Sequence, residues 1–375
     1  MNIGVMRERA PGERRVSITP NGAASLISAG HHVLVESTAG VGSGFSDAMY
    51  EDKGAHIASD WPKVCDQSQM LLMVRPPEML EPIHPRTIMI GMLQGWSRST
   101  TIDQWLGSHA ITAFSLDSMP RVSRAQNMDV LSSMSTVAGY RAVILASELL
   151  ERFFPMLMTA AGTIIPAKVL VLGAGVAGLQ AIATAHRLGA VVKAFDTRLA
   201  AKEQVESLGA SFLNIALSET GTSDGYAAGL NQDQHRQELE FLKRFVNEAD
   251  VIITTAQIPG REAPILITSD MVSGMKPGSV IVDLAGESGG NCELSKPGRL
   301  VQAHGVKISA PLDLVSQMAS DASFLYSRNL VNFVAYLDSL ALESPDAGDT
   351  TDEIYLRTRL TSSSSVLTDQ VSNAR

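Results

Sequence analysis

The stretch that most constrains the fold is Lys168–Asp196, with the sequence KVLVLGAGVAGLQAIATAHRLGAVVKAFD. Val169–Leu172 is a short apolar run, typical of a buried parallel strand, and a glycine-rich turn follows it at once. The next residues predict a helix to about Leu188, and Val191–Phe195 predicts a second strand that ends before Asp196. Strand, turn, helix and strand in this order predict a βαβ unit with parallel strands.

Three glycines in this turn, Gly173, Gly175 and Gly178, have the spacing GxGxxG. The first permits a tight turn, the second lets backbone amides approach a pyrophosphate, and the third lets helix and strand pack closely. Ala174 and Val176 lie between them at the start of the helix, where an anion is favoured. The spacing alone also occurs in plain glycine-rich turns, but its strand and helix context predicts a dinucleotide site.

Asp196 stands near the offset of ~20 residues expected for the acid that binds a ribose 2′-hydroxyl. A carboxylate there repels a 2′-phosphate, so we expect NAD(H) rather than NADP(H). Thr197 and Arg198 follow directly. The arginine leaves two alternatives open: it holds a 2′-phosphate, or it is a solvated charge that covers the adenine.

The composition is that of an ordinary globular protein, with 375 residues, 45% hydrophobic and 18% charged. A net charge of −9 without a basic cluster argues against nucleic acid as a partner. Cys65 and Cys292 are too few for a disulfide framework or a zinc site, so we expect buried thiols and no metal. The N-terminus does not resemble a signal peptide, and we expect no apolar run of the ~20 residues that span a bilayer.

Strand-like and helix-like segments alternate along the chain, which predicts an α/β fold of two Rossmann-like domains with parallel sheets and the cofactor in the interdomain cleft. The strands expected in the first part are Asn2–Val5, Val33–Glu36, Gln69–Val74, Thr87–Leu93 and Ile111–Leu116. Those expected later are Ser211–Leu213, Val251–Thr255, Ser279–Leu284 and Val306–Ser309.

We place an N-terminal α/β domain at residues 1–132 and a dinucleotide-binding domain at residues 133–308. A long apolar helix, Met128–Met158, would link them, and a helix within residues 309–342 would return to the first domain. Residues 343–375 are polar and include TSSSS, which predicts a flexible tail.

Ala216–Asn231 is long, polar and glycine-containing, whereas the neighbouring loops are short. Such loops are lids or structureless insertions. As a lid it would close on the cofactor through Tyr226, which follows Gly225. As an insertion it would carry that tyrosine incidentally.

Several segments resemble the NAD(H)-binding component, domain I, of the proton-translocating nicotinamide nucleotide transhydrogenases. They are PRVSRAQNMDVLSSMSTVAGYRAV, GVAGLQAIATAHRLGA, KEQVESLGA, ITTAQIPGREAPILIT and MKPGSVIVDLAGESGGNCELSKPG, and the similarity covers about residues 1–340. The resemblance implies hydride transfer to NADP(H) on a partner subunit and proton movement through separate membrane subunits. It also implies a homodimer that is cytoplasmic and peripheral on the cytoplasmic face of the inner membrane.

The alanine dehydrogenases share this architecture and provide an alternative, a soluble amino-acid dehydrogenase. Those enzymes carry a substrate-binding lysine and a catalytic histidine where this chain has Arg75 and Gln94. Oxidation of an amine needs a proton acceptor, whereas hydride transfer between two nicotinamides leaves no substrate proton to remove. A third alternative is a non-catalytic NAD(H)-sensing protein with the same fold.

The resemblance assigns Gln126 to the side of the nicotinamide ring, and Arg121, Asp129 and Ser132 to its positioning. The alternative for Arg121 and Asp129 is an ion pair that caps the long helix, and for Gln126 a solvated loop residue. The residues expected to contact the cofactor are Gly173, Ala174, Gly175, Val176, Gly178, Asp196, Thr197, Arg198, Gly225, Tyr226 and Gln257.

Overall fold

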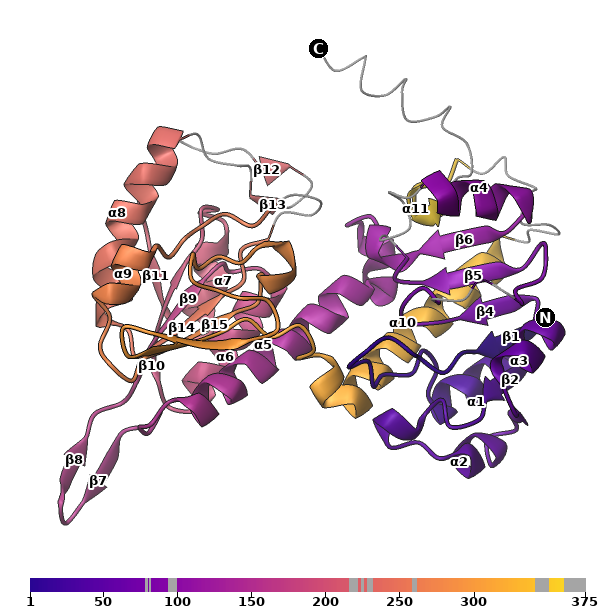
Figure 1. The fold of residues 1–375 in the computed structure, drawn as a ribbon, viewed down its shortest axis with the longest axis horizontal. Helices are drawn as coiled ribbons and strands as arrows, with labels where there is room; N and C mark the ends of the chain where they lie inside the picture. Colours follow the sequence, from indigo (N-terminus) through magenta and orange to yellow (C-terminus); the bar gives the residue numbers. More distant parts are fainter. Residues whose placement is uncertain are drawn as a thin grey trace. The chain divides into compact units, whose positions relative to one another are not determined.

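The computed structural model describes residues 1–77, 80, 82–93, 100–215, 222–223, 226–227, 232–257, 262–340 and 351–360. The chain forms two compact units (Figure 1). The first consists of Met1–Met134 with Ser316–Arg375, and the second of Ser135–Val315. Each unit is built around its own mainly parallel sheet.

The first sheet has the strand order β18-β6-β5-β4-β1-β2-β3. Its strands are β1 (Asn2–Val5), β2 (His32–Glu36), β3 (His56–Ala58), β4 (Met70–Leu72), β5 (Ile88–Gly91), β6 (Thr112–Ser115) and β18 (Arg359–Leu360). All neighbours pair in parallel except β18, which runs antiparallel to β6. Every residue of β4 and β5 is buried, as in a sheet covered on both faces. The strand order reverses between β1 and β4, which is the switch point of this sheet.

The helices of the first unit are α1 (Pro20–Ser28), α2 (Asp47–Glu51), α3 (Trp61–Gln67), α4 (Thr100–Ser108), α10 (Ala319–Ser339) and α11 (Glu353–Thr358). Thr19 caps α1 by accepting the Gly22 amide, and Pro20 takes the first helical position. Helix α10 packs against α1 so closely that a Cβ atom at Gly22 would lie 2.1 Å from the Ser327 hydroxyl. The core of the unit therefore includes residues from both ends of the sequence.

The second sheet has the order β11-β10-β9-β14-β15-β17-β16. Its strands are β9 (Lys168–Leu172), β10 (Val191–Phe195), β11 (Ser211–Leu213), β14 (Val251–Thr254), β15 (Val280–Asp283), β16 (Leu300–Ala303) and β17 (Val306–Ser309). Only the pair β16 and β17 is antiparallel among these neighbours. Taken in chain order, the first five strands have the same places as the first five of the other sheet, and the switch point lies between β9 and β14. The last two strands are exchanged, because β16 forms the edge outside β17.

The helices of the second unit are α5 (Val130–Leu149, which begins in the first unit), α6 (Val176–Arg187), α7 (Ala201–Ser207), α8 (Gln232–Glu248) and α9 (Ser269–Ser273). By length and composition α5 could cross a membrane, contrary to the expectation of no such run. Helix α5 contributes Ala142, Val143 and Ala146 to the buried core, and a core helix meets the same criteria.

The long helix ends earlier than its apolar sequence predicts. Helix α5 stops at Leu149 rather than Met158, and its last carbonyl accepts a hydrogen bond from Lys307 Nζ at 2.9 Å. Pro155 then prevents a helical continuation. The following residues form an antiparallel hairpin of β7 (Leu157–Thr159) and β8 (Gly162–Ile164), which projects from the second unit in Figure 1.

The prediction of a flexible tail over residues 343–375 is wrong for its described part. Helix α11 buries Ile354 and Tyr355, and β18 extends the first sheet. Asp352 begins this segment by accepting the Ile354 amide at 2.9 Å and pairing with Arg124. The polar average of the tail hid these apolar residues; residues 341–350 and 361–375 lie outside the described part.

The polar loop predicted at Ala216–Asn231 contains a short hairpin. Thr222–Ser223 (β12) pairs antiparallel with Tyr226–Ala227 (β13). Gly225, the Tyr226 side chain and the remainder of the loop lie outside the described residues, so the lid stays a prediction.

Candidate functional site

The glycine turn lies at the carboxyl end of β9, and two of its glycines are required by the protein itself. Gly173 has φ +100°, and a Cβ atom there would lie 2.6 Å from Thr255 Oγ1. A Cβ atom at Gly178 would lie 1.8 Å from the Gly173 carbonyl oxygen. Such distances exclude any side chain, so these residues set the turn and the close approach of α6 to it.

Gly175 has a different reason to be glycine. It is the N-cap of α6 at φ −76°, where any residue is tolerated. A Cβ atom there would meet nothing in the described protein within 4 Å. The absence of a side chain therefore keeps clear the space above the helix N-terminus, as a bound phosphate group requires. Ala174 is buried beside it, and Val176 is exposed.

Asp196 follows β10 and holds the glycine turn from the side. Its Oδ2 accepts the Ala174 amide at 2.7 Å, and its Oδ1 accepts the Arg198 amide at 2.9 Å. The Arg198 side chain donates to both carboxylate oxygens, each at 2.9 Å. Arg198 is thus ion-paired rather than a solvated charge, and Thr197 between them is half-buried. Binding of a ribose by Asp196 stays a prediction.

A buried carboxylate supports the neighbouring strand end. Asp283, at the end of β15, is fully buried, and its five donors are Thr254 Oγ1, Ser295 Oγ and the amides of Ala285, Asn291 and Cys292. Asn291 then binds both the amide and the carbonyl of Ala256. Gln257 follows, exposed, with its amide on the Leu284 carbonyl at 2.7 Å. The family resemblance covers this segment, but these supporting roles were not predicted; the available signal was an acid at a strand end before two glycines.

Gln126, predicted beside the nicotinamide, lies in the first unit on the 3-10 helix η4 (Ser123–Met128). Ala125 and Met128 are buried, whereas Gln126 is exposed. The carbonyl of Asn127 accepts two amide hydrogen bonds from α10, from Asn329 and Asn332, each at 2.9 Å. These contacts hold η4 against α10 and leave the glutamine side chain exposed.

Asp129 and Ser132 lie together at the start of α5. The Asp129 carboxylate accepts the Ser132 amide at 2.9 Å and the Ser132 hydroxyl at 2.5 Å, which is the geometry of a helix N-cap. Arg121 is exposed before η4. These three residues and Gln126 belong to the first unit, whereas the glycine turn, Asp196 and Gln257 belong to the second.

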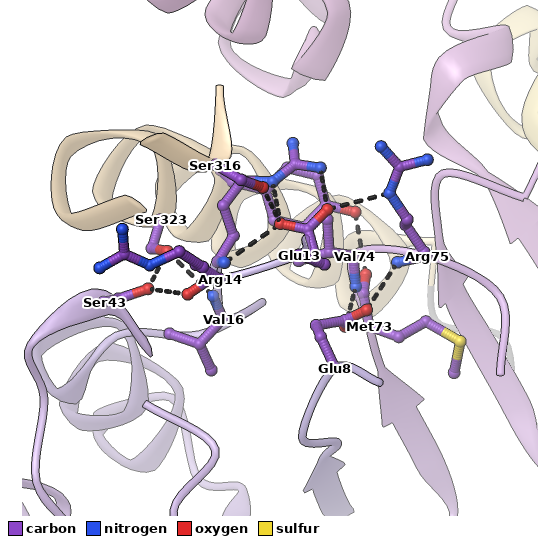
Figure 2. Close-up of polar contacts among 12 residues, drawn as sticks. Glu8, Glu13, Arg14, Val16, Ser43, Met73, Val74, Arg75, Ser316 and Ser323 are labelled. Atoms are coloured by element: carbon purple, nitrogen blue, oxygen red, sulfur yellow. Dashed lines mark hydrogen bonds and ion pairs between the residues drawn. The ribbon is translucent and has the colours of Figure 1, made fainter. Parts of the chain in front are cut away.

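The switch point of the first sheet is occupied by the protein's own acids (Figure 2). Glu8, which follows β1, accepts the amides of Val74 at 2.6 Å and Arg75 at 3.1 Å. Glu13 accepts three hydrogen bonds from Arg15, one from its amide and two from its guanidinium group. It also accepts from Arg75 Nε at 2.9 Å and from the Ser316 hydroxyl at 2.7 Å. Neither glutamate was predicted from the sequence, because nothing in the spacing shows that they meet β4.

These two carboxyl groups have opposite pKa shifts. Burial raises the pKa of Glu8 to about 8 despite its two backbone donors. Burial also acts to raise the pKa of Glu13, but the hydrogen bonds and charge of Arg15, with Ser316 and Arg75, lower it to about 2. Glu8 therefore keeps its proton to a higher pH than an ordinary carboxyl group, next to a Glu13 that stays ionised.

Most histidines lie away from the carboxyl edges of the sheets. Those that precede or begin strands, and so lie at the amino edges, are His31, His32, His56, His84, His109 and His304. His186 ends α6, also at the amino edge. His235, on α8, pairs with Glu238, which feels the charge of Asp196 beside β10. No histidine in the described structure, which includes all eight, stands at a switch point.

Two doubly wound sheets, one with a glycine turn and a following acid at its switch point, define the class of α/β dinucleotide-binding proteins. Family models agree: the model "Alanine dehydrogenase/PNT, N-terminal domain" matches residues 4–138, and "Alanine dehydrogenase/PNT, C-terminal domain" matches residues 142–363. The chain belongs to this alanine dehydrogenase/PNT family.

Relatives on both branches of the family are similar over most of the chain. The first part of the NAD(P) transhydrogenase alpha subunit of Rhodospirillum rubrum is 46% identical over 344 residues, 89% of each chain. The alanine dehydrogenase of Halomonas elongata is 33% identical over 307 residues, 79% of this chain and 76% of that one. The crystal structure of transhydrogenase from Sinorhizobium meliloti matches with a TM-score of 0.86 and 39% identity, covering 96% of this chain and 98% of that one. The predicted family and fold class are confirmed.

Proposed function

We propose that this chain binds NAD(H) and exchanges hydride with NADP(H) held by a partner subunit, as the NAD(H)-binding component of a proton-translocating transhydrogenase. The observation that carries the proposal is the contrast at the carboxyl edges: a nucleotide cradle around Gly175 and no described histidine at either switch point. The greater identity to the transhydrogenase relative than to the alanine dehydrogenase supports it. Proton movement is assigned to membrane partners, with this subunit at the cytoplasmic face of the inner membrane.

In this proposal the second unit binds the nucleotide. The amides above Gly175 hold the pyrophosphate at the positive end of α6. Asp196 receives the ribose hydroxyls after Arg198 turns aside, and Thr197 and Gln257 add polar contacts. Tyr226, with Gly225, closes from the β12–β13 loop. NAD(H), when bound, supplies or accepts the hydride.

The η4 segment of the first unit supplies polar groups for the nicotinamide end. Gln126 is exposed and neutral, so it can pair with a carboxamide without changing its charge. Asp129 and Ser132 keep the start of α5 rigid, and Arg121 orients the carboxamide. Direct transfer between two rings needs only correct positioning and exclusion of water, so residues without acid–base function suffice.

The cations at the switch point of the first sheet argue against the alternative function, that of an amino-acid dehydrogenase. Arg15 and Arg75 are these cations, at the place where a substrate carboxylate would be bound. Both are held by Glu13, an internal carboxylate. Gln94, at the position where the alanine enzymes carry their histidine, lies outside the described residues and has no basic group.

Reconstitution distinguishes these functions. The chain is added to membranes that contain the partner subunits but lack this one, and reduction of an NADP analogue by NADH is followed. We expect activity to be restored, and Gln126→Ala to lower the transfer rate about tenfold or more while the Kd for NADH changes less than twofold. Oxidation of L-alanine with NAD by the isolated chain would refute the proposal.

We propose that two copies of the chain associate through the β7–β8 hairpin. A two-stranded ribbon is marginal by itself, and this one and its flanks expose Phe153, Met156, Met158 and Ile165, each more than half exposed. Met158→Asp places a charge on the most exposed of them and should yield a monomer mass by light scattering. A dimer that persists in this variant would place the interface elsewhere.

A further inference from the structure

A cavity of about 450 Å³ lies at the carboxyl ends of β1, β2 and β3 in the first unit. Its size is that of a small-molecule site. The lining residues that matter here are Arg7, Arg9, Glu36, Thr38, Asp60 and Trp61. They lie at the ends of three adjacent parallel strands, whereas the acids of Figure 2 contact the residues that follow β4, on the other side of β1.

The cavity repeats the nucleotide cradle of the second unit in one respect. Glu36 ends the second strand of its sheet, as Asp196 follows the second strand of the other. Glu36 Oε2 accepts the amide of Arg7 at 2.9 Å, and Asp196 Oδ2 accepts that of Ala174 at 2.7 Å. In both sheets this amide belongs to the second residue after the first strand.

The counterions also correspond. Arg9 pairs with Glu36 at 2.5 Å, and Arg198 pairs with Asp196 at 2.9 Å. Both carboxylates are almost fully buried, and both guanidinium side chains are only partly exposed. Glu36 therefore stands in the first sheet at the position that binds a ribose in dinucleotide-binding sheets.

The first sheet cannot hold a whole dinucleotide. Where the second sheet has a short glycine turn, the first has residues 6–19, and Glu8 takes the amides of Val74 and Arg75 at the switch point. The position of a pyrophosphate is thus filled by a side chain of the protein. Over β1, β2 and β3 the described residues leave a cavity with room for one nucleoside.

Arg7 gives the cavity an anion-binding group. Its guanidinium contacts Thr38 Oγ1 at 3.4 Å, and it has no ion pair within the described residues. Trp61 and Pro62 provide an apolar wall at the start of α3. The Asp60 carboxylate, held by the Ser59 hydroxyl and the Lys63 amide, can accept from an exocyclic amine and repels phosphate toward Arg7.

We propose that this cavity binds an adenosine monophosphate, with the ribose on Glu36 once Arg9 turns aside, the phosphate on Arg7 and the base over Pro62, which is exposed next to the buried Trp61. The site is separate from the one used in hydride transfer and does not depend on the proposed function. AMP and NADH would then bind to the same chain at the same time, one to each unit.

The experiment titrates the full chain with AMP after the second unit is saturated with NADH, by calorimetry and by the NMR signal of the Trp61 indole. We expect a second binding event that shifts this signal. Arg7→Gln should weaken it about tenfold, the contribution of one charge-assisted contact, without changing the Kd for NADH. Arg198→Gln, the matched change in the second unit, should alter NADH binding and leave the AMP event unchanged.

Three results would overturn the inference. One is the absence of a second binding event up to about 5 mM AMP, because a Kd above this concentration is too weak for a specific site. Another is an AMP event that NADH suppresses and Arg7→Gln leaves unchanged, because AMP would then occupy only the second unit. The third is equal binding of inorganic phosphate and AMP, which would leave an anion site without nucleoside recognition.

Discussion

The first five strands, taken in chain order, have the same places in both sheets, but the loop that follows the first strand differs. After β9 the chain turns within Gly173–Gly175 and starts a helix, whereas after β1 it runs through residues 6–19 before α1 begins. In the second sheet the space that a Cβ atom of Gly175 would occupy is open in the described structure. In the first sheet the corresponding edge is filled by Glu8 and Glu13. Topology therefore creates the same polar edge twice, and the loop decides whether a ligand or the protein supplies the anion.

The largest expected effect is on the stability of the second unit. Gly178→Ala puts a Cβ atom 1.8 Å from the Gly173 carbonyl oxygen, which only a backbone shift relieves. We expect a loss of about 3 kcal/mol or more in the free energy of unfolding, measured by denaturant titration. A Gly178→Ala protein with unchanged stability would show that α6 does not pack on the turn in this way.

The matched variant in the same turn is Gly175→Ala. Its Cβ atom meets no described atom within 4 Å, so the melting temperature should stay within about 2 °C of that of the unchanged protein. The Kd for NADH, measured by calorimetry, should rise about 10- to 100-fold because the methyl group occupies the path of the pyrophosphate. Unaltered NADH binding would contradict the proposal that the pyrophosphate binds above Gly175, and the second sheet would then have no nucleotide site that the first lacks.

The first unit should respond to pH through Glu8. Its pKa is about 8 in the folded protein against an ordinary 4.5, so the folded state binds more protons between these values. Stability contributed by this proton is present below about pH 4.5 and is lost as the pH rises to 8. Glu8→Gln keeps an acceptor for the Val74 amide and cannot ionise. We therefore expect the Glu8→Gln protein to lose about 2 kcal/mol less unfolding free energy between pH 4.5 and pH 8 than the unchanged protein. This is less than the whole pKa shift would give, because the Glu8 side chain is only half-buried and solvent screens its charge.

Glu13 should act in the opposite direction. Its pKa of about 2 in the folded protein lies below 4.5, so its contribution is lost as the pH falls through this range. Unfolding measured from pH 3 to 9 separates the two windows. A Glu8→Gln protein that loses stability toward pH 8 as steeply as the unchanged protein would contradict the assignment.

The smallest expected effect is a change in the preference for NADH over NADPH, tested at Asp196 after β10 and at Glu36 at the end of β2. Asp196→Asn keeps an oxygen for the Ala174 amide but removes the charge, so the preference for NADH over NADPH should fall about tenfold. Glu36→Gln, the equivalent change in the first unit, should leave both nucleotide affinities unchanged. Equal preference in the Asp196→Asn protein and its parent, by calorimetry, would mean that Arg198 has already neutralised the carboxylate.

Local patterns in the sequence predicted the parts of the fold that depend on neighbours along the chain. The run from Lys168 to Asp196 became β9, the turn, α6 and β10 with ends within one residue of those expected. The start of α1 at Thr19 and Pro20 is equally local, because the cap and the fixed φ of proline involve only adjacent residues. The alternative for Arg121 and Asp129 was an ion pair that caps the long helix. Asp129 caps α5 through Ser132, and such a cap is also a local signal.

What the sequence by itself determined is therefore the α/β class, the glycine turn and the acid that follows its second strand, because each rests on short-range sterics and hydrogen bonding. Only the tertiary structure showed that a Cβ atom at Gly175 would contact no described atom of the protein. It also decided where α5 ends and that β18 joins the first sheet next to β6. It alone brought Glu8 to the amides of Val74 and Arg75, residues more than sixty positions away. Such meetings depend on the packing of distant segments, and no pattern within a short window of sequence contains that information.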